Sequence, residues 1–567
     1  MKIFSFDIFD TCLVRKCGDP HNLFDILAFN VLGDNSSDIN RMEFVNIRIL
    51  GEQKARDLSH KEDVTIYDIY KQCNFEDFTS LSIEEIINFE IKLEKESLLP
   101  VFNIKNIIEN LRKQDNLILF ISDMYLPSSE IVEVLKKFDL FNDGDGLYLS
   151  GEIGLTKSSG NLFKYIRNEN GYLFNDWKHY GDNKYSDIKV PESLGIKTQF
   201  IKHNYTPYEE IWRNSFDTKN QYSKLLAGVS RSIRLSSDKD LQVDFTVDLI
   251  SPLYVSLVYK ILMNAQNDNV NTLFFLSRDA YILYEIALIF NSLFPSLSIK
   301  YLHISRDSLY NFTNEDLRLE YFIQVGLATT DEKVGIVDVR TTGKTQKTIN
   351  QLFEINGYNK VKGYYFEIVS EQRDFVFIED CNFEFYNNRK YENSTLNGIA
   401  DHSDILEHFF SLTDKQRTIG YKKSDNEIYP VFENTEIDDI KFKYFNIVSN
   451  MHCVIVKLFT EIFIETKLYK YADNILYSLA IPTLCSFGNK PLKYYLPALV
   501  DFTVYDEHHR QFIPYIIKFK FIDWLYFLFD RKKIKNKYLW KKGTLYFNVS
   551  VSIVDFYHKI KILKKYK

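Results

Sequence analysis

The 567-residue sequence has few cysteines and no long hydrophobic run, and both shortages exclude classes of protein. Its six cysteines form no Cys-x-x-Cys pair, which is typical of reduced thiols in a cytosolic protein and not of a disulfide scaffold. Acidic residues at positions 7 and 10 interrupt any apolar segment of a secretory signal. The best candidate for a membrane span, "FIDWLYFLF" at 521–529, contains an aspartate and is shorter than the roughly 20 residues that a span needs. We therefore expect a soluble, cytoplasmic protein.

Charge is distributed unevenly along the chain. The net charge is −7, yet residues 531–567 carry twelve lysines and arginines against one aspartate, which gives them +11 and leaves −18 for the remainder. Aromatic residues flank a dense basic run in "FDRKKIKNKYLWKK", and such a segment can lie on the anionic inner face of a membrane. A solvated basic helix is the alternative. Nucleic-acid binding is not expected, because the rest of the chain is acidic and has no evident stacking motif.

The spacing of apolar residues predicts strands that alternate with helices, which is typical of doubly wound parallel sheets. In the first 205 residues, strands are expected at 1–10, 116–124, 147–149 and 177–181. Amphipathic runs fill most of the interval between the first two strands and predict an inserted helical cap at about 16–110.

The same alternation starts again near residue 240, in "NTLFFLSRDAYILYEIALIF" and "KVGIVDVRTTGKTQKTINQLF". The fold class is therefore predicted to be α/β, with a first domain at 1–205 and a second α/β domain at 206–440. A helical region at 441–528 and a basic tail at 529–567 are expected to follow.

Polar residues follow the predicted strands of the first domain. Asp7 follows "IFSF", Ser122 follows "LILFI", Lys157 lies in "GLTKSSG", and Asp182 and Asp187 lie in "YGDNKYSD". Ligands of an open parallel sheet bind beyond the carboxyl ends of its strands, so we expect these five side chains to meet. A carboxylate nucleophile, a hydroxyl, a cation and an acidic pair that can hold Mg²⁺ suit phosphoryl transfer.

Each of these residues also has a structural interpretation. Lys157 could be a solvated surface lysine, Asp187 an acid in the first turn of a helix, and Ser122 with Asp123 an N-cap pair. Asp10 with Thr11 is most simply explained as a cap of the turn that follows the first strand.

In order, the motifs "FDIFDT", "FISD", "GLTKSSG" and "GDNKYSD" resemble the four motifs of the haloacid dehalogenase (HAD) superfamily. The resemblance covers about residues 1–205, and the helical insert stands where that family has its cap. It implies that Asp7 is the nucleophile and shares a Mg²⁺ site with Asp182 and Asp187. It also implies that Ser122 binds the phosphoryl oxygens and that Lys157 neutralises an aspartyl-phosphate.

The sequence departs from this family at one position. The general acid/base of the family's phosphatases, two residues after the nucleophile, corresponds to Phe9, and Asp10 stands where many members have glycine. The dehalogenase branch also has an aromatic residue there, but the acidic pair Asp182 and Asp187 favours a phosphate ester over a haloacid. Phe9 leaves a second interpretation open, in which a catalytically degenerate domain serves as a binding module for a glycosyltransferase.

The second domain has its own candidate phosphate site at the ends of predicted strands. Backbone N–H groups at a helix start, hydroxyls and arginines favour a bound phosphate. The candidate residues are Arg278, Asp279, Arg306, Asp338, Thr342, Gly343 and Thr345. Capping threonines and ion pairs of Arg278 with Asp279 and of Arg306 with Asp307 are the structural alternatives.

Residues 240–500 resemble the region that follows the HAD domain in certain bacterial proteins encoded with surface-polysaccharide enzymes. The resemblance includes "DILEHFFS" at 404–411, whose Glu407 is a candidate buried acid. It implies a process, surface-polysaccharide synthesis, and a glycosyltransferase as a partner. Because Arg278 and Arg306 suit bidentate phosphate binding, a phosphorylated sugar or nucleotide sugar is the expected substrate. The turn "DVRTTGKTQ" distantly resembles that of phosphoribosyltransferases, so a second domain that is itself a glycosyl- or phosphoribosyl-type transferase is the other alternative.

Overall fold

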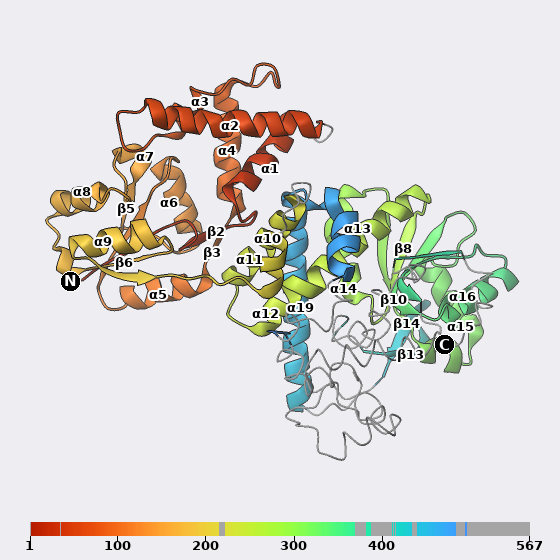
Figure 1. Cartoon of the computed structure of the whole chain (residues 1–567). Coiled ribbons are helices and arrows are strands. Elements are labelled where there is room, and N and C mark those ends of the chain that lie inside the picture. Colours follow the sequence, from red (N-terminus) through yellow and green to blue (C-terminus); the bar gives the residue numbers. More distant parts are fainter. Residues whose placement is uncertain are drawn as a thin grey trace, which may run out of the picture. The chain divides into compact units, whose positions relative to one another are not determined.

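The computed structural model describes residues 2–33, 36–214, 221–368, 382–386, 411, 413, 416–433, 439–482 and 494–495. The chain divides into two compact units, Met1–Lys239 and Asp240–Lys567 (Figure 1). The expectations for Glu407, for "FIDWLYFLF" and for the basic tail at 529–567 concern residues outside these ranges.

The first unit contains a five-stranded parallel sheet. Its strands are β1 (Ile3–Phe6), β4 (Leu117–Ser122), β5 (Gly146–Leu149), β6 (Trp177–Gly181) and β7 (Lys197–Phe200), in the order β5-β4-β1-β6-β7. The apolar residues of the central strands pack on both faces, because helices cover a parallel sheet on both sides. One such core joins Ile3, Ile121 and Trp177 to Phe163 of α8 (Asn161–Asn170).

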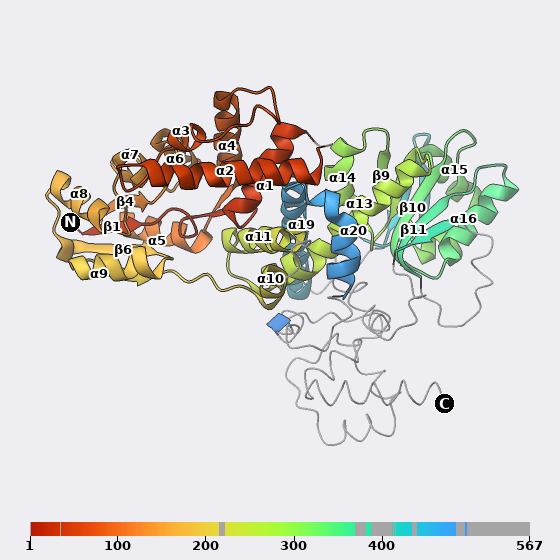
Figure 2. The same ribbon diagram turned by 45° about the horizontal axis from the view of Figure 1, so that its top comes forward.

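A helical insertion between β1 and β4 forms the cap. Its helices are α1 (Pro20–Leu32), α2 (Asp38–Leu58), α3 (Ile66–Tyr70) and α4 (Ile83–Ser97), and they lie together in both views (Figures 1 and 2). Asp19, Ser37, Thr65 and Ser82 cap their first turns through side-chain oxygens. The chain enters and leaves the cap through a two-stranded antiparallel ribbon, β2 (Leu13–Arg15) with β3 (Leu98–Pro100).

The first unit continues past the boundary expected at residue 205. Its remaining helices are α5 (Phe102–Arg112), α6 (Ser128–Lys137), α7 (Ser150–Ile153), α9 (Val190–Leu194), α10 (Pro207–Arg213) and α11 (Gln221–Ser236). Helix α11 packs against β2, β3 and α5, so it covers the ribbon that carries the cap. The approach is close at Gly18, where a Cβ would lie 2.6 Å from the Cα of Gly228 and where φ is +76°.

The second unit contains another parallel sheet. Its strands are β8 (Thr272–Leu276), β9 (Ser298–Leu302), β10 (Val334–Thr341), β11 (Lys362–Ile368) and β12 (Phe383–Phe385), in the order β12-β11-β10-β8-β9. The order reverses between β8 and β10, which is the topological switch point of a doubly wound sheet. A hairpin of β13 (Thr418–Ser424) and β14 (Glu427–Phe432) belongs to the same unit.

Helices of the second unit surround this sheet. They are α12 (Leu241–Phe245), α13 (Ser251–Asn267), α14 (Tyr281–Phe290), α15 (Glu315–Val325), α16 (Lys344–Ile355), α19 (Asp439–Glu465) and α20 (Ala472–Asn474). Residues of α15 and α16 share one core with Phe274 and Ile336 of the sheet.

Two helical stretches of the described residues are long and apolar enough to cross a membrane by length and composition alone. They are Leu241–Asn267, whose most apolar window is 89% buried within the structure, and Ile447–Glu465, whose window is 50% buried. Polar residues interrupt both stretches, so neither is an unbroken apolar run in the sequence. Buried core helices of soluble proteins have the same composition.

Candidate active site

Asp7 lies at the carboxyl end of the central strand of the first sheet, directly after β1. Its backbone N–H donates to the carbonyl oxygen of Tyr180 in β6 at 2.8 Å. The Nζ atom of Lys157 lies 2.6 Å from Oδ1 of Asp7 and 2.7 Å from Oδ1 of Asp187. All three side chains are buried, and because an uncompensated buried charge is costly, the lysine and the carboxylates stabilise one another. The interpretation of Lys157 as a solvated surface residue is therefore wrong.

Asp182 completes an acidic cluster with Asp7 and Asp187. Each of the three offers a carboxylate oxygen, and these atoms lie within 4.8 Å of one another. Among the described residues, no other group of histidines, cysteines and acids lies close enough together to hold a metal ion. The donors are oxygen atoms only, which Mg²⁺ prefers. The cluster therefore fits the magnesium site that the sequence predicts.

The protonation of this cluster is set by burial and by its neighbours. Burial raises the pKa of Asp7 to about 7, against the opposing effect of Lys157. Burial and the nearby charges of Asp10 and Asp187 raise the pKa of Asp182 to about 6. Burial opposes ionisation of Asp187 as well, but Lys157 and His179 hold its pKa well below its usual range. A bound cation would relieve the repulsion among these carboxylates.

A buried chain of hydrogen bonds positions Asp187. The indole N–H of Trp177 donates to Oγ of Ser5 at 2.6 Å, and this hydroxyl lies 2.7 Å from Nδ1 of His179. Nε2 of His179 is in turn 3.3 Å from Oδ1 of Asp187. Gly181 leaves the space that the carboxylate fills, since a Cβ there would lie 2.4 Å from Cγ of Asp187. The core of the sheet thus fixes the acid at the site.

The loop after β4 contributes Ser122 and Asp123. Ser122 is the last residue of β4 and is buried. Asp123 accepts a hydrogen bond from the backbone N–H of Lys157 at 2.8 Å, so it holds the loop that carries the lysine. The two do not form an N-cap pair, because α6 begins after Pro127 and has no side-chain cap.

The cap is fastened to the loop that carries Lys157. The carboxylate of Glu62, between α2 and α3, accepts hydrogen bonds from the backbone N–H and hydroxyl of Thr156 at 2.8 and 3.2 Å. It also accepts from Oγ of Ser159 and Nδ2 of Asn161, each at 2.6 Å. These donors hold the pKa of Glu62 at about 2, against the opposing effect of burial. Glu62 therefore links the cap to the loop that carries Lys157.

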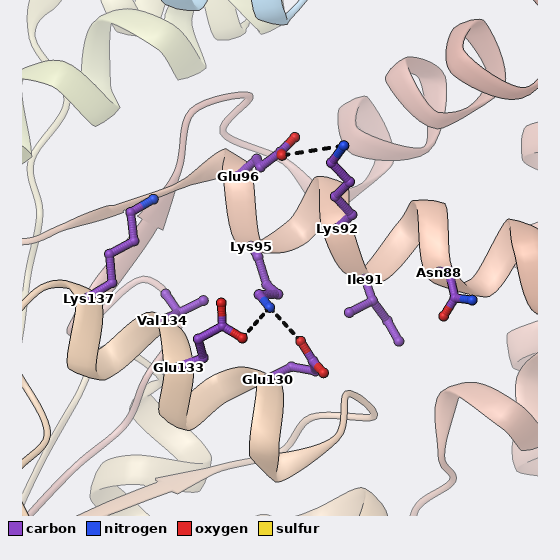
Figure 3. Close-up of a pocket in the computed structure, with 9 residues that line it drawn as sticks. All are labelled: Asn88, Ile91, Lys92, Lys95, Glu96, Glu130, Glu133, Val134 and Lys137. Atoms are coloured by element: carbon purple, nitrogen blue, oxygen red, sulfur yellow. Dashed lines mark hydrogen bonds and ion pairs between the residues drawn. The ribbon is translucent and has the colours of Figure 1, made fainter.

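A second set of contacts joins cap helix α4 to core helix α6. Nζ of Lys95 lies 2.7 Å from Glu130 and 2.5 Å from Glu133, and the three side chains converge in a groove between the two helices (Figure 3). None of the residues that line this groove belongs to the acidic cluster. The groove is thus a cap–core contact and not the candidate active site.

Phe9 and Asp10, which follow Asp7 in the loop after β1, contact residues outside the acidic cluster. The guanidinium of Arg15 lies 4.4 Å from the ring centroid of Phe9, and Arg15 pairs with Glu94 of α4 through two N–H groups at 3.0–3.2 Å. Asp10 has a left-handed backbone (φ 55°), which suits the expected turn. Its carboxylate also pairs with Nη1 of Arg231 in α11 at 2.9 Å.

The candidate residues of the second unit gather at the carboxyl edge of its sheet. Arg278 and Asp279 follow β8, Arg306 and Asp307 follow β9, and Thr342 and Gly343 precede α16, in whose first turn Thr345 lies. Asp338 lies inside β10 and not beyond its end, because the strand continues to Thr341. The charges of Asp279 and Asp338 both act on the buried hydroxyl of Tyr254, whose pKa is raised mainly by burial.

One of the two acids considered for a local Arg–Asp ion pair in this unit pairs with a distant arginine. Asp307 pairs with Arg417 at 3.1 Å instead of with Arg306. Arg340 approaches Glu367 of the neighbouring strand at 3.7 Å.

No family model and no curated protein matches the chain. Several solved structures are similar to part of it. A HAD phosphatase from Thermococcus onnurineus is 19% identical over 36% of this chain and 87% of its own, with a TM-score of 0.27. A HAD family enzyme from Bacteroides thetaiotaomicron, in complex with magnesium and inorganic phosphate, is 16% identical over 36% and 94%, with a TM-score of 0.27. A dehalogenase with an intermediate complex is 14% identical over 36% and 87%, with a TM-score of 0.26. At such identities the reaction of this chain has to be inferred from its own residues.

Three residues of this region have no counterpart in the sequence prediction. They are Arg231, Glu62 and Glu94, which bind Asp10, the Lys157 loop and Arg15. Each lies more than 75 positions from its partner, so no local pattern reports the contact. For Glu94 in α4 and Arg231 in α11, the one sequence signal is a charged residue within an amphipathic helix; Glu62 lies in a loop and has none.

Proposed function

We propose that the first unit is a HAD-type, Mg²⁺-dependent phosphohydrolase or phosphotransferase. The observation that carries the proposal is the buried arrangement of Lys157 between Asp7 and Asp187, with Asp182 completing an oxygen-only cluster. A carboxylate beside a buried cation, next to a site for a divalent ion, suits attack on phosphorus. Mg²⁺ held by the three aspartates would offset the negative charge of the phosphoryl group.

In this proposal Oδ2 of Asp7 attacks phosphorus, because Oδ1 already accepts from Lys157. Lys157 stays beside the carboxylate and neutralises the aspartyl-phosphate that forms. Ser122 donates a hydrogen bond to a phosphoryl oxygen, and the cap, fastened through Glu62, limits the access of water. Hydrolysis of the aspartyl-phosphate then restores Asp7.

We further propose a phosphorylated sugar or nucleotide sugar of surface-polysaccharide synthesis as the substrate, and a cytoplasmic protein whose basic tail contacts the inner face of the membrane. Both ideas rest on the sequence resemblance and on the charge of the tail. The switch point between β8 and β10 supports a second phosphate-binding site or a transferase activity in the second unit, since ligands of such sheets bind there.

The proposal is tested with the full-length protein, Mg²⁺ and a panel of phosphate compounds, by measuring phosphate release. Asp7→Asn should abolish turnover, while Asp143→Asn, at an acid whose side chain is 95% exposed, should leave it unchanged. Phosphate release that survives in Asp7→Asn, or that is absent from the whole panel, contradicts the proposal.

Beryllofluoride separates the enzyme from a degenerate binding module. As a phosphoryl analogue, it should raise the melting temperature of the wild type with Mg²⁺ and leave that of Asp7→Asn unchanged. A wild type that does not respond favours the binding-module alternative, for which Phe9 is the motivating residue.

A further inference from the structure

The turn that follows Asp7 connects the nucleophile candidate to another member of the acidic cluster. Within this turn the backbone N–H of Cys12 donates to the carbonyl oxygen of Ile8 at 2.8 Å. Thr11 is buried and donates through Oγ1 to Oδ1 of Asp182 at 3.3 Å. The conformation of the turn therefore helps to set the position of a candidate metal ligand as well as of the backbone next to Asp7.

Asp10 shapes this turn with a backbone conformation that is uncommon outside glycine. Its φ angle of 55° lies in the left-handed region, and such a conformation persists where surrounding contacts hold it. Contacts from beyond the sheet do so here. Nη1 of Arg231 in α11 lies 2.9 Å from Oδ1 of Asp10, and His203 forms a hydrogen bond with the backbone of Asp10.

Arg231 is itself held in place. Its side chain is only 11% exposed, and its guanidinium lies 5.0 Å from the ring centroid of Tyr205. One turn further along α11, Arg234 pairs with the buried carboxylate of Glu209 at 2.7 and 2.8 Å and donates to the carbonyl oxygen of Asn204 at 2.8 Å. The segment before α10 and the helix α11 are thus fastened to each other on either side of the Arg231–Asp10 contact.

Helix α11 also lies against the ribbon that carries the cap. It packs on β2 and β3, and Gly228, which lies one turn before Arg231, meets the start of the cap. A Cβ on Gly228 would lie 2.5 Å from the carbonyl oxygen of Cys17 and 2.7 Å from the backbone nitrogen of Gly18. Because the two backbones touch, α11 has little room to shift against the ribbon, and it presents Arg231 to Asp10 from a fixed position.

From these contacts we propose that Arg231 is a positioning residue of the candidate active site, through which α11 braces the turn after the nucleophile. The inference rests on the proposed phosphohydrolase function. It adds to that function a residue 221 positions beyond Asp10, outside the part of the chain that resembles the HAD family. Without Arg231 the turn relaxes, Thr11 no longer fixes Asp182, and the carboxylates lose their alignment for attack on phosphorus.

Hydrogen exchange of the full-length protein tests the brace directly. In Arg231→Met, amide exchange in the peptide that spans residues 7–15 should be about tenfold faster than in the wild type or more. Arg213→Met is the matched control, because the Arg213 guanidinium lies 4.6 Å from the same Tyr205 ring and its removal leaves the Asp10–Arg231 pair in place; its exchange should stay within about twofold. Arg231→Lys keeps the charge and should restore most of the protection. Wild-type exchange in Arg231→Met overturns the inference.

Asp10→Asn approaches the same contact from its other side, so the test does not depend on whether Arg231→Met folds. It should speed exchange in the same peptide as Arg231→Met does. Unchanged exchange in Asp10→Asn would show that the pair does not hold the turn.

Steady-state kinetics with Mg²⁺ and 4-nitrophenyl phosphate separate positioning from a merely structural role. A misplacement of about 1 Å can cost about 100-fold in rate, so kcat of Arg231→Met should fall about tenfold or more, while KM changes less than about threefold and Arg231→Lys recovers most of kcat. The double variant Asp10→Asn with Arg231→Met should be no slower than the slower single variant, since both remove one contact. Losses that multiply in the double variant, or an unchanged kcat in Arg231→Met, overturn the inference. A wild type that turns over no phosphate compound contradicts the proposed function instead, and the exchange measurement still decides whether Arg231 holds the turn.

Discussion

Exchange of Lys157 for methionine tests the electrostatics of the site most directly. Methionine keeps much of the side-chain volume and removes the charge between Asp7 and Asp187, to which Nζ is bound at 2.6 and 2.7 Å. Removing one partner from a buried ion pair costs about 3–5 kcal/mol, because the remaining charges stay buried without compensation. We therefore expect the free energy of unfolding of the first unit to fall by about that amount at pH 8.5 without Mg²⁺.

The loss of unfolding free energy in Lys157→Met should grow with pH, because Asp7 ionises as the pH rises. Its pKa is raised by burial from 3.8 to about 7, and loss of Lys157 raises it further. A carboxyl group with a raised native pKa stabilises the fold fully below its unfolded pKa, and this contribution disappears as the pH rises through the native value. The variant should therefore lose least near pH 5, where Asp7 is protonated, and most above pH 8.

The assay is urea denaturation of the full chain, read by hydrogen-exchange labelling of peptides from β1 and β6, so that it reports on the first unit alone. Lys164→Met, at an exposed lysine in α8, is the matched control and should change the free energy of unfolding by no more than about 0.5 kcal/mol. Saturating Mg²⁺ should reduce the difference in free energy of unfolding between the wild type and Lys157→Met, since a bound cation again offsets the charge of the carboxylates. If Lys157→Met loses the same free energy of unfolding at pH 5 and at pH 8.5, or loses none, Lys157 does not compensate the charge of Asp7.

Three further predictions concern the same unit. Mg²⁺ should raise the melting temperature more at pH 8 than at pH 6, because Asp7 and Asp182, with pKa values of about 7 and about 6, must lose protons to bind it. Equal shifts of the melting temperature at the two pH values would contradict the assignment of the cluster as a magnesium site. Glu62→Gln should raise KM several-fold with a smaller change in kcat, since the amide weakens the link between cap and Lys157 loop, and an unchanged KM would show that the link is incidental. Gly228→Leu should destabilise the first unit by about 2 kcal/mol or more, because a Cβ there would lie 2.5 Å from the carbonyl oxygen of Cys17. Urea denaturation measures this change, and a variant as stable as the wild type would show that α11 can shift to make room.

The sequence predicts the parts of this site that depend on local pattern. The strand before Asp7, the strand before Ser122 and the loop with Asp182 and Asp187 are each short apolar runs that end in polar residues. In a parallel sheet such ends share one edge whatever the loops between them do. Lys157 does not follow from this rule alone, because α7 (Ser150–Ile153) lies between it and the end of β5.

Contacts between distant segments could not be predicted in this way. The ribbon of β2 and β3 joins residues about 85 positions apart, and each strand is only three residues long, too short for a periodic signal. Asp338 is expected beyond a strand end, but β10 continues for three more residues, and in "VDVRT" β-branched residues alternate with Asp338 and Arg340 without a turn signal. The extent of a strand is decided by its neighbours in the sheet, and a single sequence does not contain them.

The stretch from Asp7 to Arg15 joins the acidic cluster to the cap and to α11. In nine residues the chain supplies the nucleophile candidate, packs Phe9 against the arginine that holds α4, and pairs Asp10 with α11. A carboxyl group at position 9 would lie beside Arg15 and compete with Glu94 for it. Phe9→Asp should therefore weaken the buried Arg15–Glu94 contact that attaches α4.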